Sequence, residues 1–328
     1  MVLVLGSLFQ HFAYGEENSG VNQNGKVGTA TEDNVEGHSS SENISAEGDS
    51  IKGNIVEEHS ADMSSTEGTS TEAQERILIT DTNYESYDNK LHSWWFKRND
   101  THEPSGCTDE VNIEEYQGFY TFPTTEKVMY ITFDCGYENG YTADILDTLK
   151  EEQVPAAFFV TQNYIRDNVD LVKRMKEEGH LVCNHTVSHP CMPEKSIAEQ
   201  RDQILQIEEF MKQATGYEMD LFFRPPKGEY SERTLQLAKD LGYITVFWSM
   251  AYLDYDVNNQ PTTSHVVEHF EKYHHPGAIP LLHNVSKANH DALPQILYNL
   301  KKEGYQFGTL YDLQSKCINN QEQTLQNE

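Results

Sequence analysis

The sequence is poor in basic residues and contains no long apolar run. Its 328 residues include 24 lysines and arginines against 53 aspartates and glutamates, which gives a formal net charge of -29. Nucleic-acid binding needs a basic face, and electrostatic binding to an anionic membrane needs clustered lysine or arginine, so this charge argues against both partners. No stretch of about 20 consecutive apolar residues occurs, which argues against a membrane span in this chain.

Two further patterns are missing. The five cysteines are an odd number without regular spacing, so a disulfide framework is not indicated and no pairing is predicted. They are Cys107, Cys135, Cys183, Cys191 and Cys317. No Gly-x-Gly-x-x-Gly sequence follows an expected strand, so a dinucleotide-binding fold has no support.

The first 15 residues indicate export. A short apolar run is followed by Ala13-Tyr-Gly15, a small-x-small pattern typical of the end of a secretory signal peptide, although the positively charged start of such a peptide is missing. We therefore expect a secreted or cell-envelope-facing protein. Whether residues 1–15 are cleaved or anchor the chain stays open.

The next segment, 16–76, differs sharply from the rest of the chain in composition. Acidic residues, Ser, Gly, Asn and Thr dominate it, and aromatic residues are lacking. Such a composition cannot bury a core, so we expect a disordered acidic linker. Residues 77–126 regain aromatic residues, among them Trp94-Trp-Phe-Lys-Arg98, and we expect this segment to wrap the domain that follows.

From residue 127 onward, strand-like apolar runs alternate with helical segments, which is typical of a parallel sheet covered by helices. Strands are expected at 128–133, 156–161, 180–184, 220–223, 243–249, 278–282 and 305–310. Helices are expected at 141–152, 168–178, 196–214, 231–241, 263–273 and 291–303. Five glycines follow helices, as expected of left-handed C-caps: Gly179, Gly216, Gly242, Gly277 and Gly304. We predict an α/β fold, a distorted (β/α) barrel of about seven parallel strands with outer helices, over 127–315, followed by a flexible tail, 316–328.

The strand expected at 128–133 ends on Asp134 and Cys135. In βα folds the reacting groups lie at the carboxyl ends of the strands, so we interpret this strand end as the centre of a catalytic site. One of the two residues would bind a metal, and the other would act as a base toward the attacking water. The alternative is a strand-end cap for Asp134 and an inert buried thiol for Cys135.

Two imidazoles follow the strand expected at 180–184. His185 and His189 are four residues apart, a spacing that places both rings on one side of a helical turn. Neutral imidazoles are good ligands for Zn²⁺ and similar divalent ions. The spacing alone is a modest signal, but its place directly after a strand favours a metal site over two structural histidines.

The run Arg224-Pro-Pro-Lys-Gly228 follows the next strand. The prolines stiffen this loop, and Gly228 lets its backbone approach a ligand closely. A rigid loop can aim a backbone N–H at a developing oxyanion, and Arg224 could form a bidentate pair with a carboxylate such as Asp134. The alternative is a rigid turn that carries a surface arginine.

Two later segments complete the expected site. Leu281-Leu-His283 is an apolar strand that ends on a histidine in line with the other strand ends, so His283 is the candidate general acid. Trp248 and Tyr255, from the segment before it, could form the wall of a sugar site or pack in the core. Asp254, in the same segment, could tune the acid or the arginine.

Together these segments resemble the five motifs of the NodB-homology polysaccharide deacetylases, carbohydrate esterase family four, and they occur in the family's order across about 127–313. The motifs are Thr132-Phe-Asp-Cys-Gly136, His185-Thr-Val-Ser-His189, Arg224-Pro-Pro-Lys-Gly228, Trp248 to Asp254, and Leu282-His283. Four stretches resemble the delta-lactam-biosynthetic de-N-acetylases, a branch that acts in sporulation. These stretches are Thr132-Phe-Asp-Cys-Gly-Tyr-Glu-Asn-Gly-Tyr141, Ser93-Trp-Trp-Phe-Lys-Arg98, Arg224-Pro-Pro-Lys-Gly228 and Val246-Phe-Trp-Ser249.

The resemblance implies a hydrolase that removes an N-acetyl group with the help of a metal. By this resemblance Asp134 is the general base, and His185 and His189 bind a divalent ion, Zn²⁺ with Co²⁺ or Mn²⁺ as alternatives. The wider family has an aspartate as third ligand where this chain has Cys135. A thiolate there would favour softer ions, and without it the site would consist of two histidines.

The resemblance also assigns roles to the other motifs. Arg224 orients the base, and His283 protonates the leaving amine. The backbone N–H of Lys227, which replaces a common tyrosine, completes the oxyanion site. The wider family has an aspartate at the position of Ala251, which tunes the acid and the arginine, and in this chain Asp254 is left for that task.

The branch implies a peptidoglycan substrate, the N-acetylmuramic acid of glycan strands from which the peptide has been removed. The freed amine would then close on the lactyl carboxylate to give the muramic δ-lactam of spore cortex. Arg166 could pair with the lactyl carboxylate, or it is a solvated helix end. The alternatives are N-acetylglucosamine of peptidoglycan or chitin-like chains as substrate, and a glycan-binding protein that has lost catalysis. The sequence does not indicate an oligomeric state, and a monomer is the default expectation.

Overall fold

The computed structural model describes residues 82–317. The expected signal segment 1–15 and acidic linker 16–76 lie outside these residues, as does most of the expected tail 316–328. The first two tail residues are described, and they belong to a helix over 310–317 rather than to a flexible tail. None of the helices in the described range is long and apolar enough to cross a membrane.

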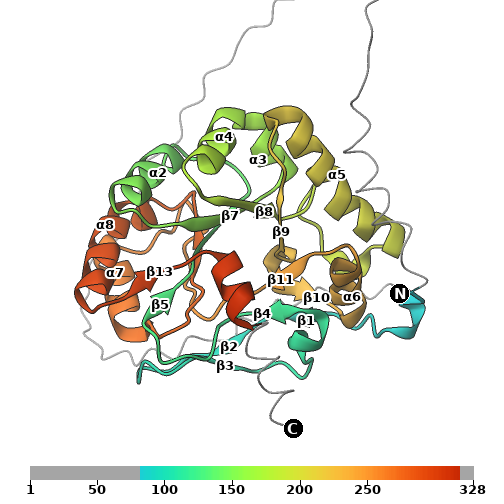
Figure 1. The fold of residues 1–328 in the computed structure, drawn as a ribbon, viewed down its shortest axis with the longest axis horizontal. Helices are drawn as coiled ribbons and strands as arrows, with labels where there is room; N and C mark the ends of the chain where they lie inside the picture. The colour runs from blue at the N-terminus through green and yellow to red at the C-terminus, as the bar shows by residue number, and fades with distance from the viewer. Residues whose placement is uncertain (1–81, 318–328) are drawn as a thin grey trace, which may run out of the picture. The chain divides into compact units, whose positions relative to one another are not determined.

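A seven-stranded parallel sheet forms the centre of the fold (Figure 1). In spatial order its strands are β12 (Leu281–His283), β6 (Ile131–Cys135), β7 (Ala156–Val160), β8 (Leu181–Asn184), β9 (Asp220–Phe223), β11 (Ile244–Val246) and β4 (Gly118–Phe119). Isolated bridges, Thr121 to Ala278 and Met250 to Pro280, connect the chain near the two edges in place of a continuous ladder. The predicted distorted (β/α) barrel is therefore confirmed.

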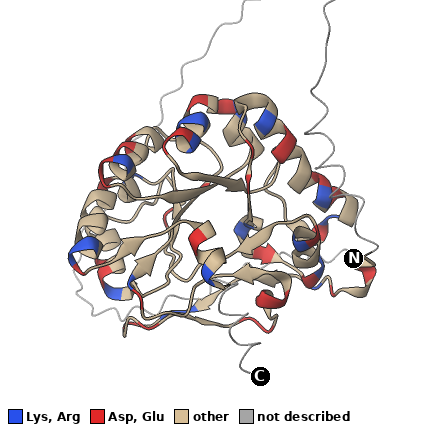
Figure 2. Ribbon diagram, viewed as in Figure 1, with Lys and Arg blue, Asp and Glu red and all other residues tan. Residues whose placement is uncertain are grey.

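The sheet is covered on the outside by helices (Figure 1). They are α2 (Thr142–Glu151), α3 (Gln162–Asp167), α4 (Val169–Glu177), α5 (Ile197–Thr215), α6 (Glu232–Asp240), α7 (Thr263–Tyr273) and α8 (Lys287–Lys302). Short polar side chains cap them, as in the capping box of α5, where Ser196 and Glu199 each accept a backbone N–H of the other. Charged residues gather on these outer helices (Figure 2).

The seventh strand of the sheet is not the one that the sequence predicts. The predicted last strand, 305–310, is reduced to β13 (Gln306–Phe307), which pairs with β5 (Val128–Met129) in a separate two-stranded sheet. The seventh place is taken by β4, which pairs with β11. A strand of two residues is too short to show a period of two, so the sequence pattern does not reveal it.

Alternation along β6 separates the core from the site. Successive side chains on a strand point to opposite faces of the sheet. Phe133 and Cys135 belong to a buried apolar cluster that also contains Ile145 of α2 and Leu293 of α8. Asp134, between them, faces the other side.

An N-terminal segment packs along the sheet and carries three short strands. β1 (His92–Ser93) pairs with β10 (Glu229–Tyr230), and β2 (Phe96–Lys97) pairs with β3 (Gly106–Cys107). Trp94, between β1 and β2, is buried, and its ring lies 4.5 Å from that of Phe247. The short 3-10 turns η1 (Tyr84–Ser86), η2 (Ile113–Tyr116), η3 (Met192–Glu194) and η4 (Pro226–Gly228) complete the described elements.

Gly277 has a different role from the predicted helix cap. α7 ends at Tyr273 with His274 as its C-cap. Gly277 has φ +74°, and a Cβ there would lie 1.8 Å from the carbonyl oxygen of Phe122, so the residue permits a close approach of two chain segments.

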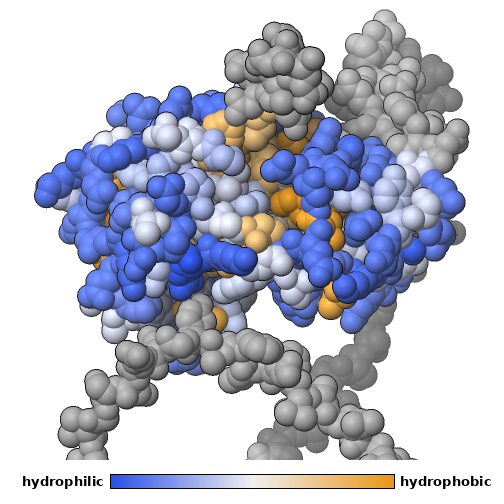
Figure 3. All heavy atoms as spheres, turned by 90° about the horizontal axis from the view of Figure 1, so that it is seen from below, coloured by the Kyte–Doolittle hydropathy of each residue, from blue (hydrophilic) through white to orange (hydrophobic). Residues whose placement is uncertain are grey.

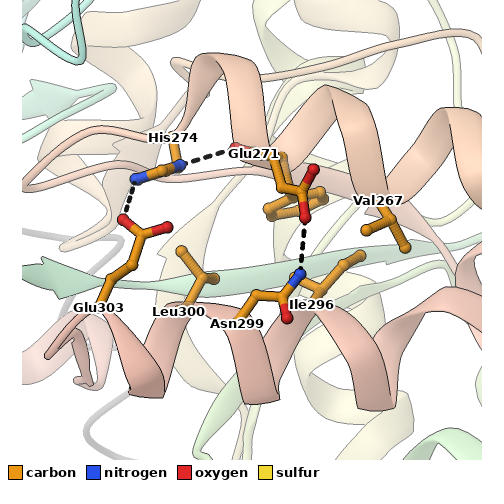
Figure 4. Close-up of a pocket in the computed structure, with 8 residues that line it drawn as sticks. Val267, Glu271, His274, Ile296, Asn299, Leu300 and Glu303 are labelled. Atoms are coloured by element: carbon orange, nitrogen blue, oxygen red, sulfur yellow. Dashed lines mark hydrogen bonds and ion pairs between the residues drawn. The ribbon is translucent and has the colours of Figure 1, made fainter.

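A small pocket lies between the outer helices α7 and α8 (Figure 4). His274 Nε2 lies 3.0 Å from a carboxylate oxygen of Glu303, and the Asn299 side chain donates to Glu271 at 2.9 Å. None of the residues that line it belongs to the predicted catalytic motifs. The face of the molecule in Figure 3 is mostly hydrophilic, with hydrophobic side chains gathered near its middle.

Candidate active site

Strand ends bring the predicted catalytic residues to one edge of the sheet. β12 and β6 are neighbours, and their register places His283 directly beside Asp134. His185 follows β8, and Arg224 follows β9, its neighbour. Because all these strands are parallel, their carboxyl ends meet at the same edge, where βα folds place reacting groups.

Arg224 is the centre of this arrangement and is fully buried. Its Nη1 donates to Asp134 Oδ1 at 2.7 Å, its Nη2 to Thr132 Oγ1 at 3.0 Å, and its Nε to the Val246 carbonyl at 3.0 Å. The guanidinium carbon lies 4.0 Å from the centre of the Phe159 ring. We expected a bidentate pair with Asp134, but Arg224 binds only one oxygen of this carboxylate, because its second terminal nitrogen donates to Thr132.

The surroundings of Asp134 favour its ionised form. Burial would raise the pKa of this carboxyl, but the charge of Arg224, followed by the imidazoles of His185 and His283, outweighs burial and lowers it. Asp134 Oδ2 lies 3.5 Å from His185 Nε2, beyond ordinary hydrogen-bond distance. This oxygen is therefore available to accept a proton.

His185 and His189 lie together, with ring centres 4.8 Å apart. His185 Nδ1 donates to the Arg224 carbonyl at 2.8 Å, which leaves the Nε2 lone pair on the side of Asp134. Burial lowers the pKa of both histidines, that of His189 to about 4, so both are neutral near pH 7. Neutral imidazoles with one nitrogen fixed by a carbonyl are typical metal ligands, so the donor chemistry fits a divalent ion.

Cys135 is not a third ligand of such an ion. It follows Asp134 on the same strand and therefore points to the opposite face, into the apolar cluster of α2 and α8. Burial and then the charge of Asp134 raise the pKa of its thiol well above the usual value, which opposes a thiolate. Within 82–317 no three His, Cys, Asp or Glu side chains are grouped as a metal site, so two imidazoles remain.

His283 is held by Asp254. The imidazole Nδ1 donates to Asp254 Oδ1 at 2.7 Å, and the backbone N–H of His283 donates to Asp254 Oδ2 at 2.8 Å. The side-chain amide of Asn289 donates to the same Oδ2 at 2.6 Å. Burial would lower the pKa of His283, but the charge and hydrogen bond of Asp254, together with the charge of Asp134, raise it. Asp254 is thus the carboxylate that contacts His283 in this chain, which has Ala251 where the wider family has an aspartate.

The Arg224–Gly228 loop has a tightly constrained backbone. Lys227 has the left-handed conformation (φ 58°), and its side chain is exposed and lies 4.0 Å from Glu229. Gly228 has φ +68°, and a Cβ there would lie 2.7 Å from the Trp248 ring and 3.1 Å from Trp94 Cβ. Only glycine fits between these tryptophans, so the loop is fixed through its backbone.

The aromatic candidates divide between core and surface. Trp248 is buried, and its carbonyl accepts a hydrogen bond from Trp94 Nε1 at 3.0 Å, so it packs in the core. Tyr255 is 57% exposed, and its ring lies 5.8 Å from that of His283 in an edge-on arrangement, a position suited to contact with a sugar. Arg166 lies exposed on α3 and pairs with Asp167 at 2.7 Å and Asn163 at 3.0 Å, as expected of a solvated helix end.

Sequence reasoning missed several supporting residues. Thr132 lies two positions before Asp134 on one strand, so the period of two could have revealed that both face Arg224. Asn289, which holds Asp254, lies inside α8, where no local pattern distinguishes it from a surface residue. Trp94 belongs to the segment expected to wrap the domain, and the structure places it in the core, where its backbone N–H donates to the Gly228 carbonyl at 2.8 Å.

The comparisons with known proteins identify the family of this chain. The polysaccharide deacetylase family profile matches residues 122–246. The chain is 43% identical over 231 residues to the peptidoglycan-N-acetylmuramic acid deacetylase PdaA of Bacillus subtilis, over 70% of this chain and 88% of that protein. It is 35% identical over 204 residues to a peptidoglycan-N-acetylglucosamine deacetylase of Bacillus cereus, over 61% of this chain and 94% of that one.

The solved structures show the same relation. The structure of Bacillus subtilis PdaA, described as a family 4 carbohydrate esterase, has a TM-score of 0.68 and 42% identity, over 70% of this chain and 99% of that one. The fold is a (β/α) barrel, and its site brings a buried carboxylate and three imidazoles to one edge of the sheet. The chain belongs to the polysaccharide deacetylases, carbohydrate esterase family 4, which are hydrolases of carbon–nitrogen bonds other than peptide bonds.

Proposed function

We propose that the protein removes the acetyl group from the N-acetylmuramic acid of peptidoglycan glycan strands. The observation that carries this proposal is the 43% identity to a muramic acid deacetylase over 88% of its length. The site supports it with a base and an acid on neighbouring strands, as the hydrolysis of an amide requires.

The base is Asp134. Arg224 keeps its carboxylate ionised, and Asp134 Oδ2 faces the histidine pair, where the attacking water would lie. As the water oxygen forms a bond to the acetyl carbonyl carbon, its proton passes to Asp134 Oδ2. Because the Asp134–Arg224 pair is buried, little reorganisation accompanies this transfer.

His185 and His189 would hold a divalent metal, Zn²⁺ in the first place and Co²⁺ or Mn²⁺ otherwise. Bound there, it would polarise the amide carbonyl and the attacking water. The chain itself supplies two neutral imidazoles and fixes His185 through the hydrogen bond from its Nδ1 to the Arg224 carbonyl. A site with two protein ligands leaves positions for water and substrate.

The acid is His283. Asp254 raises its pKa, so the imidazole carries the proton that the departing nitrogen needs. The carbon–nitrogen bond then breaks, the proton of His283 goes to the amine, and acetate and the free amino sugar are the products. The backbone N–H of Lys227 would stabilise the negative charge that develops on the carbonyl oxygen.

The proposal extends to the fate of the product. On a muramic residue without its peptide, the freed amine lies near the lactyl carboxylate and can close on it with loss of one water, giving the δ-lactam found in spore cortex. The lactyl carboxylate needs a cation, for which Arg166 stays a prediction. The apolar segment 1–15 would direct the enzyme out of the cell, where its substrate lies.

One observation favours a second candidate, N-acetylglucosamine as the substrate, because a relative named for that sugar is 35% identical over 94% of its length. Both substrates carry the same acetamido group, so the catalytic residues do not distinguish them. The lactyl group of muramic acid is the chemical difference.

The experiment is mass spectrometry of peptide-stripped glycan strands after incubation with the purified enzyme, with and without added Zn²⁺ and with a chelator. Asp134→Asn serves as the inactive control. Loss of acetyl and then of one water at muramic acid is the expected result. Acetyl loss at glucosamine would establish the second candidate. Binding to the strands without metal-dependent acetyl loss would overturn both and leave a glycan-binding protein.

A further inference from the structure

Glu138 lies in the loop between β6 and α2, four residues after Asp134, and its side chain is half-buried. One oxygen, Oε1, accepts three backbone N–H groups, those of Gly140 at 2.6 Å, Tyr141 at 2.9 Å and Thr142 at 3.2 Å. These groups stand at the start of α2, where a helix has unpaired donors and favours negative charge. This half of the carboxylate is a helix cap.

The other oxygen, Oε2, makes contacts that a helix cap does not need. It accepts the hydroxyl of Thr142 and, at 3.1 Å, the hydroxyl of Tyr164 on α3. The side-chain amide of Asn284 donates to Thr142 Oγ1 at 3.0 Å and lies 3.4 Å from Glu138 Oε2. The hydroxyl oxygens of Tyr164 and Thr142 lie 3.2 Å apart. Glu138, together with the Thr142 hydroxyl that it binds, therefore joins α2, α3 and the loop after β12.

Asn284 directly follows the acid, His283, and is fully buried. Its side-chain Nδ2 also donates to the Tyr137 carbonyl at 3.0 Å, and its backbone N–H donates to the Asp134 carbonyl at 3.4 Å. A carbonyl and a carboxylate only accept hydrogen bonds, so the orientation of the amide is determined. The residue after the acid is thus tied both to the base and to the loop that follows the base.

We infer that Glu138 is a positioning residue that holds the loop of the base Asp134 and the loop of the acid His283 in one fixed arrangement. The inference rests on the proposed function, in which the two groups act on the same amide. Base and acid must both reach that amide, and displacements of about 1 Å between reacting groups cost up to roughly 100-fold in rate.

The test uses Glu138→Gln, Asn284→Ala and the double variant in the full chain. Glutamine keeps the size of the side chain but replaces one accepting oxygen with a donor, which cannot pair with these donors. Each single variant is expected to lower kcat roughly 10-fold or more with KM within about twofold, because geometry and not binding is disturbed. The kcat of the double variant is expected to be no lower than that of the less active single variant, because both substitutions break the same hydrogen-bond network.

The matched control is Glu199→Gln. Glu199 also caps a helix, α5, where its Oε2 accepts the backbone N–H of Ser196 at 2.9 Å, but it lies outside the site. We expect this variant to lose stability and keep kcat. A Glu138→Gln variant that behaves in the same way, or a double variant whose losses multiply, would reduce Glu138 to a helix cap.

A second measurement needs no substrate. Hydrogen exchange followed by mass spectrometry is expected to show faster exchange in Glu138→Gln both at 136–142 and at 283–286, although these segments are far apart in the sequence. Faster exchange at 136–142 alone would overturn the inference. If the wild-type enzyme deacetylates no muramic strand, the proposed function fails, and the exchange data still decide whether Glu138 joins the two loops.

Discussion

Two carboxylate pairs lie on the two sides of the site, and in the proposed mechanism they support opposite roles, a base on one side and an acid on the other. On each side a buried carboxylate accepts a hydrogen bond of 2.7 Å from a nitrogen, Asp134 from Arg224 and Asp254 from His283. Arginine is a permanent cation, so the first pair keeps its carboxylate ionised as a base. Histidine titrates near neutral pH, and Asp254 raises the pKa of His283, which favours the protonated imidazole that the proposed acid requires.

The remaining contacts reinforce this difference. Both oxygens of Asp254 accept hydrogen bonds, from the imidazole and backbone of His283 and from Asn289, so this carboxylate is held in place. Asp134 binds Arg224 with one oxygen, and its second oxygen faces His185 at 3.5 Å. In the proposed mechanism Asp134 takes up the proton, because its second oxygen accepts no hydrogen bond at ordinary distance, whereas both oxygens of Asp254 already do.

Removal of the base should have the largest effect. Asp134→Asn is expected to lower kcat/KM by about 10²- to 10⁴-fold, the usual contribution of general acid–base catalysis, because an amide cannot take the proton of water. Steady-state kinetics on the glycan that the wild type hydrolyses measures this. A loss of less than tenfold would show that another group is the base.

The control for this variant is Asp220→Asn. Asp220 is also a buried carboxylate in an ion pair, with Lys176 at 2.7 Å, but it lies at the start of β9, away from the catalytic edge. Both variants should have a lower free energy of unfolding, measured by urea denaturation, and only Asp134→Asn should lose activity.

The ion pair of Asp134 and Arg224 also makes stability depend on pH. Because the pKa of Asp134 is lowered in the folded protein, this ion pair stabilises the fold at pH values above about 3.9, the pKa of an aspartate in the unfolded chain. The stabilisation is lost as the pH falls through the pKa of Asp134 in the folded protein.

Removal of the partner of the acid should have the next largest effect. In Asp254→Asn His283 loses the charge and the hydrogen bond of its nearest carboxylate, so burial lowers the pKa of the imidazole. The acid then loses its proton at lower pH, and the basic limb of the kcat/KM profile should move to lower pH. At pH 8 the activity should fall roughly 10-fold or more.

The pH profile of a second variant tests whether this shift is specific. Asp291 contacts His290 at 2.8 Å on the exposed start of α8. Asp291→Asn should leave the profile unchanged. A basic limb that stays in place in Asp254→Asn would show that His283 is not the acid, and the contrast between the two carboxylates would then fail.

A smaller effect is expected where Thr132 supports Arg224. Thr132→Val keeps the shape of the side chain but leaves the Arg224 Nη2 donor without its hydroxyl acceptor, which costs about 1–3 kcal/mol for a buried donor. Urea denaturation measures the loss. Thr245→Val is the matched control, because Thr245 is buried and its hydroxyl has no hydrogen-bond partner among the described residues. Equal effects of the two variants would remove Thr132 from the support of the base.

The same alternation that places Thr132 explains which part of the site was predictable. Buried strands with polar ends show in the sequence, and they correctly indicated the barrel. Cys135 was wrong as a ligand because residues next to each other on a strand face opposite sides, a rule that was already applicable to the sequence. Asn284 and Glu138 were not predictable, since their roles arise from contacts between segments about 146 positions apart.

The smallest effect is expected at Tyr255, on the open side of the acid. Its ring is 57% exposed and stands edge-on to His283 at 5.8 Å, so it can contact a sugar without holding the catalytic groups. Tyr255→Ala should raise KM several-fold and leave kcat almost unchanged, because an aromatic contact contributes on the order of 1 kcal/mol to binding. Tyr298→Ala is the control, since Tyr298 is equally exposed, at 59%, on α8. A fall in kcat in place of a rise in KM would show that Tyr255 supports the acid, and the acid side would then depend on its open face as well as on Asp254.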